Sequence, residues 1–203
     1  MFRMVQICVG IFFAVSGVPA AAADFQARIV DQQGQPVPNA VVMLYPADFS
    51  IPARIDFDWQ YQVAQKDQQF QPHVLIVPEG ATVAFPNLDR VRHHVYSFSK
   101  PNDFEMKLYG REDKRGQKFD TPGAVAMGCN IHDEMRGFVR VVDTPFVAKS
   151  DKQGAVSVDN LPVGAARLVV WHPLLRATKN ELHLELSLPA NPKQISLKMR
   201  PRE

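Results

Sequence analysis

Short apolar runs separated by glycine and proline turns constrain this 203-residue chain more than any other feature of its sequence. Runs of strand length occupy residues 25–30, 41–45, 74–77 and 82–85. Across residues 182–188, leucine recurs at every second position, which is typical of a strand with one buried face. No long amphipathic helical pattern is present, and we expect the polar stretch 100–118 to form a short helix or a loop. The sequence therefore predicts an all-β protein built from sandwiches or barrels.

Residues 1–23 have the pattern of a secretory signal peptide. Arg3 gives a positive start, residues 7–18 are largely apolar, and residues 19–23 supply the small side chains of a cleavage site. Neither this segment nor a later one is long enough to predict a membrane span. We therefore expect an exported, periplasmic protein whose mature chain starts near Asp24.

The charge of the chain is nearly balanced. It has 23 basic and 21 acidic residues and a formal charge of +2, which becomes +1 when Arg3 is removed with the leader. The basic residues are scattered among acidic ones, so we expect no binding of nucleic acid.

The mature chain is expected to keep a single cysteine. Cys8 lies in the predicted leader, where a lipoprotein interpretation has weak support, and this leaves Cys129. A lone thiol in an exported protein cannot form an internal disulfide. A free cysteine is usually a small buried hydrophobe, and for an isolated Cys129 that interpretation would be favoured. The neighbours of Cys129 favour a metal ligand instead.

Three soft or borderline metal donors lie within residues 128–135, namely Cys129, His132 and Met135. A thiolate, an imidazole and a thioether are three of the four ligands of a blue (type 1) copper site, which is completed by a second histidine. The adjacent pair His93 and His94 can supply that histidine. We expect the donors near Cys129 to lie in a tight loop between strands 124–127 and 138–142, because a regular strand would project neighbours to opposite faces.

Two other interpretations of this cluster have less support. A structural zinc ion takes four cysteine or histidine ligands, and Met135 is not a ligand of that kind. A cysteine nucleophile paired with His132 would need an orienting third group, and no oxyanion-hole signature accompanies it. The sequence therefore predicts a metal-binding protein that is not an enzyme. The remaining histidines, His73, His172 and His183, are not expected to bind the metal.

The segment 82–97 resembles the first ligand segment of cupredoxins of the plastocyanin and amicyanin type. The positions that match the family pattern are Phe85, Asn87, Asp89 and Val95. The resemblance covers roughly residues 60–142 and implies a Greek-key β-sandwich that binds one copper ion. It implies His93, Cys129, His132 and Met135 as ligands, with His94 as the alternative to His93, because His94 stands where the family has asparagine.

The same resemblance implies a one-electron carrier, with His132 as the residue through which electrons pass. Charged residues of both signs would surround the docking face: Arg90, Arg92, Asp133, Glu134 and Arg136. Its partners would be redox proteins, such as a cytochrome or a dehydrogenase, whose identity the sequence leaves open. Two alternatives stay open: a copper storage or delivery protein, and a cell-envelope binding module with a structural metal.

A second resemblance concerns the two ends of the chain. Residues 29–42 resemble the opening of a carboxypeptidase-regulatory-like β-sandwich, and the later part of that pattern appears only in residues 150–173. This implies a split sandwich domain formed by residues 24–48 and 146–200, with a cupredoxin domain at 55–145 inserted between its parts. The alternative is a single enlarged sandwich.

Overall fold

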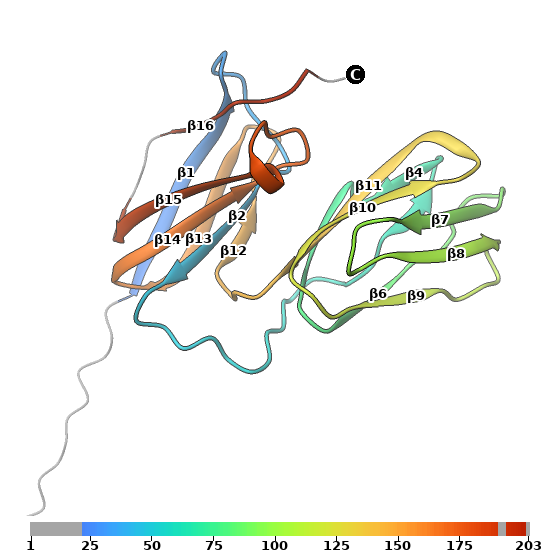
Figure 1. Ribbon diagram of the computed structural model, residues 1–203, viewed down its shortest axis with the longest axis horizontal. Coiled ribbons are helices and arrows are strands. Elements are labelled where there is room, and N and C mark those ends of the chain that lie inside the picture. The colour runs from blue at the N-terminus through green and yellow to red at the C-terminus, as the bar shows by residue number, and fades with distance from the viewer. Residues whose placement is uncertain (1–21, 191–193, 202–203) are drawn as a thin grey trace, which may run out of the picture.

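The computed structural model describes residues 22–190 and 194–201, and in this part of the chain it is an all-β protein, as predicted. The strands form two groups, which lie side by side in Figure 1. The terminal unit consists of β1, β2 and β12–β16, and the central unit consists of β3–β11. The predicted leader falls almost wholly outside the described residues, and β1 begins at Ala22. The described part of the chain contains no helix that could span a membrane bilayer.

The terminal unit is a pair of sheets. One has the order β13-β1-β16 and the other the order β12-β2-β14-β15. The bounds are β1 Ala22–Asp31, β2 Val41–Pro46, β12 Val147–Lys149, β13 Ala155–Pro162, β14 Gly164–Trp171, β15 Glu181–Leu188 and β16 Ile195–Leu197, with a short 3₁₀ turn at Thr178–Asn180. Strands from both ends of the chain share each sheet, since β1 pairs with β13 and β2 pairs with β14. The domain bounds given above stay a prediction.

The central unit is built around a five-stranded sheet with the order β5-β11-β10-β7-β8. Two further pairs, β3-β4 and β6-β9, complete it. The bounds are β3 Ala64–Lys66, β4 Gln69–Gln71, β5 Val74–Pro78, β6 Ala81–Ala84, β7 His93–Ser97, β8 Phe104–Tyr109, β9 Gly116–Phe119, β10 Gly123–Cys129 and β11 His132–Val142. Strand β5 runs parallel to β11, and the other neighbours in this sheet are antiparallel. The core of this unit includes Cys129 and Met135.

The expectation of a short helix or a loop across residues 100–118 is confirmed only in part. Residues 100–103 and 110–115 form turns and loops, whereas strand β8 and the start of β9 occupy the rest of this stretch. Phe104 and Met106 alternate with Glu105 and Lys107, so one side of β8 contacts the core while the charged side chains face solvent. The high content of polar residues therefore reflects a strand at the edge of a sheet.

The two units pack against each other through a third apolar cluster. Val41, Met43, Val169 and Trp171 contribute to it from the terminal unit, and Val74, Ile76 and Val142 contribute from the central unit. Leu75 and Val77, the intervening residues of β5, belong to the core of the central unit instead. Alternate residues of one strand thus fill two different cores, which explains why four consecutive residues of β5, 74–77, are buried.

Candidate metal centre

Three of the four predicted ligands lie close together. The Sγ atom of Cys129 is 3.5 Å from Nδ1 of His132 and 3.7 Å from Nδ1 of His93. The donor atoms of these three residues all lie within 4.8 Å of one another, and the two imidazole centroids are 5.0 Å apart. Within residues 22–190 and 194–201, no other group of three histidine, cysteine or acidic side chains meets this criterion. The cysteine sulfur and two imidazole nitrogens therefore converge on one point.

A tight hairpin brings Cys129 and His132 together. Strand β10 ends at Cys129, the turn consists of Asn130 and Ile131, and β11 begins at His132. Cys129 pairs with His132, but the preceding Gly128 pairs with Arg136, so the register shifts and residues 133–135 bulge out of the ladder. A bulge of this kind bends the strand and redirects side chains, which lets donors on both sides of the turn face the same point.

The predicted loop is thus shorter than expected. We predicted strands at 124–127 and 138–142 with a loop between them, whereas β10 extends to Cys129 and β11 starts at His132. The difference arises because backbone pairing continues on both sides of the bulge. The pattern of side chains in a sequence does not predict such pairing.

Strand β7 supplies the second histidine and separates His93 from His94. The side chain of His93 is completely buried and faces Cys129. The His94 side chain leaves the opposite face of the strand, where its Nε2 lies 2.9 Å from Glu105. The geometry therefore favours His93 over His94. The turn after β10 is tied to β7 next to the cluster, since the N–H of Asn130 donates to the carbonyl of His94 at 3.0 Å.

Met135, the fourth predicted ligand, lies in the bulge of β11 and is buried. It belongs to the same core cluster as Cys129, which is itself only 4% exposed. His132 is partly exposed, whereas His93 is not. The cluster is therefore closed toward the core and reaches the surface at His132.

A carboxylate that the sequence analysis left without a role contacts the cluster. Oδ2 of Asp89 lies 2.9 Å from Nε2 of His93. Burial opposes the charge of Asp89, but the backbone N–H of Gln68, the ring of His93 and the backbone N–H of Asp67 all hydrogen-bond to it, and together they hold its pKa below the ordinary value. The position of Asp89, four residues before a histidine, was the signal available in the sequence.

The other histidines lie outside the cluster, as expected. His183 is paired with Glu181 at 3.0 Å, and the ring of His73 packs edge-on against Phe138. Nδ1 of His172 accepts the N–H of Leu174 at 3.1 Å.

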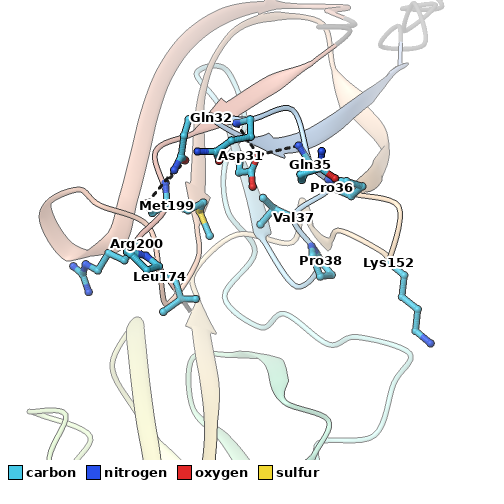
Figure 2. Close-up of a pocket in the computed structure, with 12 residues that line it drawn as sticks. Asp31, Gln32, Gln35, Pro36, Val37, Pro38, Lys152, Leu174, Met199 and Arg200 are labelled. Carbon is cyan, nitrogen blue, oxygen red and sulfur yellow. Dashed lines mark hydrogen bonds between the residues drawn. The ribbon is translucent and has the colours of Figure 1, made fainter. Parts of the chain in front are cut away.

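Two hollows of the surface lie outside the cluster of donors. The larger, of 750 Å³, lies in the terminal unit and contains none of the predicted ligands (Figure 2). In this hollow the side chain of Gln32 accepts a hydrogen bond from the backbone N–H of Met199. The carboxylate of Asp31 accepts hydrogen bonds from the backbone N–H groups of Gln33 and Gln35. The smaller hollow, of 500 Å³, lies beside the hairpin and is lined in part by His94 and Asn130.

Comparison with known proteins finds cupredoxins among solved structures. No protein-family model matches the chain, and a search of curated proteins gives no match. A purple cupredoxin from Nitrosopumilus maritimus is 22% identical, with 41% of this chain and 100% of that chain covered and a TM-score of 0.37. The P52G mutant of amicyanin in its reduced Cu(I) form is 20% identical, with 50% and 98% covered and a TM-score of 0.38.

A Cu-containing nitrite reductase from Thermus scotoductus SA-01 is 27% identical. Here 48% of this chain and 25% of that chain are covered, with a TM-score of 0.39. These three matches cover between 41% and 50% of this chain.

Proposed function

We propose that this protein is a periplasmic one-electron carrier that binds a single type 1 copper ion through His93, Cys129, His132 and Met135. The convergence of one thiol and two imidazole nitrogens, all within 4.8 Å, carries the proposal. The periplasmic location rests on the predicted signal peptide at residues 1–23.

The donor set fits copper better than zinc. Soft sulfur ligands select copper, and a trigonal set of one cysteine and two histidines with a weak axial methionine is the described geometry of blue-copper sites. A structural zinc site would need a fourth cysteine or histidine. The described residues bring three such donors together, and the next candidate is the thioether of Met135, in the same core.

The fold holds the three clustered donor side chains in fixed positions. Cys129 and His132 are fixed by the backbone pairing of a hairpin, and His93 is fixed by burial and by Asp89. A copper ion in such a site supplies a one-electron couple. Because the donors come from paired strands, the site needs little rearrangement between the two oxidation states, which favours rapid transfer.

Electrons would enter and leave at His132, which is partly exposed at the end of the hairpin. The adjacent Ile131 is 51% exposed and gives this end an apolar contact. Exposed charges of both signs, including Arg90, Arg92, Asp133, Glu134 and Arg136, give weak electrostatic steering. These features fit a small, short-lived interface with a redox protein, such as a cytochrome or a dehydrogenase.

A carrier is favoured over an enzyme by the number of donors. Metal sites that act on substrates keep an open coordination position. Three clustered donors and Met135 would fill the positions around the ion, so no such position remains. Copper delivery and a binding module with a structural metal are the alternatives that an experiment must separate.

The test is to load the purified protein with Cu(II). We expect an intense thiolate-to-copper visible band and narrow hyperfine splitting in the electron paramagnetic resonance spectrum. Cys129→Ser should abolish both, whereas His183→Ala, which alters an exposed histidine outside the cluster, should change neither. A colourless wild-type protein, or unchanged copper uptake by Cys129→Ser, would contradict the proposal. Rapid loss of copper to a mild chelator would indicate delivery instead of electron transfer.

A further inference from the structure

The imidazole of His93 is held from both sides. Its Nδ1 faces Sγ of Cys129 at 3.7 Å, and its Nε2 faces Oδ2 of Asp89 at 2.9 Å. An ionised carboxylate only accepts hydrogen bonds, so the proton of a neutral His93 must reside on Nε2. The lone pair of Nδ1 is then directed at the cluster, which is the arrangement a metal ligand requires.

Asp89 is itself rigidly placed. The N–H of Asp67 donates to one of its oxygens at 2.7 Å, and the N–H of Gln68 donates to the other at 3.0 Å. Both donors lie in the turn between β3 and β4 with positive φ angles of 56° and 54°, a conformation that aims consecutive N–H groups at one anion. The N–H of Asp89 in turn donates to the side chain of Asn87 at 2.8 Å.

The carboxylate is also shielded from water, because only 12% of its side chain is exposed and the His93 side chain is completely buried. A charge in such a position is screened much less than one at the surface. The neighbouring pair of His94 and Glu105 has the same 2.9 Å separation, but its carboxylate is 56% exposed and its imidazole lies outside the group of clustered donors. The described residues contain three histidine–carboxylate pairs, the third being His183 with Glu181, and only the pair of His93 and Asp89 faces the site.

We propose that Asp89 is a positioning residue of the metal centre, with two effects on the bound ion. It fixes the tautomer and orientation of His93, and it places a fixed negative charge one imidazole ring away from the ion. A negative charge stabilises Cu(II) more than Cu(I), so Asp89 lowers the reduction potential. This inference rests on the proposed function and adds a control of potential that the ligands alone do not provide.

Two substitutions separate the two effects. Asp89→Asn keeps an oxygen that can accept from Nε2 of His93 but removes the charge, so the reduction potential should rise while the tautomer is kept. Asp89→Ala removes the acceptor, so the metal-free protein should lose the single Nε2–H tautomer in the ¹⁵N spectrum of the His93 ring. For Asp89→Ala the Kd for Cu(II) should rise about 10- to 100-fold, as is typical when an outer-shell partner is lost.

Glu105→Gln is the matched control, since it alters the pair that faces away from the site. It should leave the potential, the Cu(II) affinity and the His93 tautomer unchanged. Thermal unfolding of each metal-free variant checks folding, and if Asp89→Ala fails to fold, Asp89→Asn decides the question through its potential.

The outcomes distinguish this inference from the proposal on which it rests. A blue wild-type protein whose potential is unchanged in Asp89→Asn would overturn the role of Asp89 and leave the electron carrier intact. The same holds if Asp89→Ala keeps the Nε2–H tautomer and the wild-type affinity. A wild-type protein that takes up no copper would overturn both.

Discussion

Nη2 of Arg140 lies 2.7 Å from Oε1 of Glu181, and this ion pair joins β11 of the central unit to β15 of the terminal unit. The two side chains are 9% and 12% exposed. The guanidinium group also lies 5.8 Å from the centre of the Trp171 ring and contacts the sulfur of Met43. The pair is therefore part of the cluster that holds the two units together.

Removing one member of this pair should destabilise the whole protein. Glu181→Leu leaves Arg140 charged and buried, which typically costs about 3 kcal/mol or more in the free energy of unfolding. The double variant with Arg140→Met should recover much of this loss, because two apolar side chains can replace a buried ion pair. Urea unfolding of the single and double variants measures the coupling. Lys118→Met, which breaks an exposed pair with Asp120, is the control and should have little effect.

His93 and His94 should differ sharply in their effect on copper. His93→Gly should abolish the visible band, and added imidazole should restore part of it by occupying the vacated position. His94→Ala should keep the band, since this side chain pairs with Glu105 on the other face of β7. Visible absorption and the copper-to-protein ratio check both variants. The reverse result would identify His94 as the ligand.

Met135 is expected to tune the copper site without being needed for copper uptake. Met135→Leu conserves volume, so the free energy of unfolding should fall by less than about 1.5 kcal/mol. Three donors remain, so copper should still bind, and the reduction potential should rise because a donor to the oxidised ion is lost. A redox titration measures this, with Met127→Leu, another buried methionine of the central core, as the control. Equal potentials in all three proteins would show that Met135 is not a ligand.

Lys149, which bonds the terminal unit to the central unit, should make the free energy of unfolding depend on pH in the alkaline range. Its Nζ donates to the carbonyl of Val74 at 2.7 Å, and burial lowers its pKa below the ordinary 10.5. Between the folded-state pKa and 10.5, the unfolded chain binds more protons at this group, so its contribution to the free energy of unfolding rises with pH.

Urea unfolding of wild type and Lys149→Met across this pH range tests the prediction. The substitution should make the slope of the free energy of unfolding against pH less positive than in wild type, whereas Lys152→Met, at an exposed position, should leave the slope unchanged. A slope that is the same in wild type and Lys149→Met would contradict it.

The sequence was sufficient to predict the features that follow from residue type and periodicity. The all-β fold is confirmed. Residue chemistry and spacing singled out Cys129 and His132 but offered His93 and His94 alike, and only the family resemblance favoured His93, which the structure places beside the other two. Strand β8 within residues 100–118 was missed, since an edge strand with a charged face resembles a loop in composition.

Contacts between segments far apart in the sequence could not be predicted in the same way. The turn that places Asp67 against Asp89 depends on backbone conformation, and the bulge near Cys129 depends on pairing register. The pairing of Arg140 with Glu181 depends on how two units pack. None of these leaves a periodic signal in one sequence.

Strand β5 turns alternate side chains into two different cores, and this has a consequence for any shortened version of the protein. If the terminal strands were removed, Val74 and Ile76 would become an apolar strip open to water. A chain cut back to the central unit is therefore expected to self-associate unless these two side chains are replaced by polar ones.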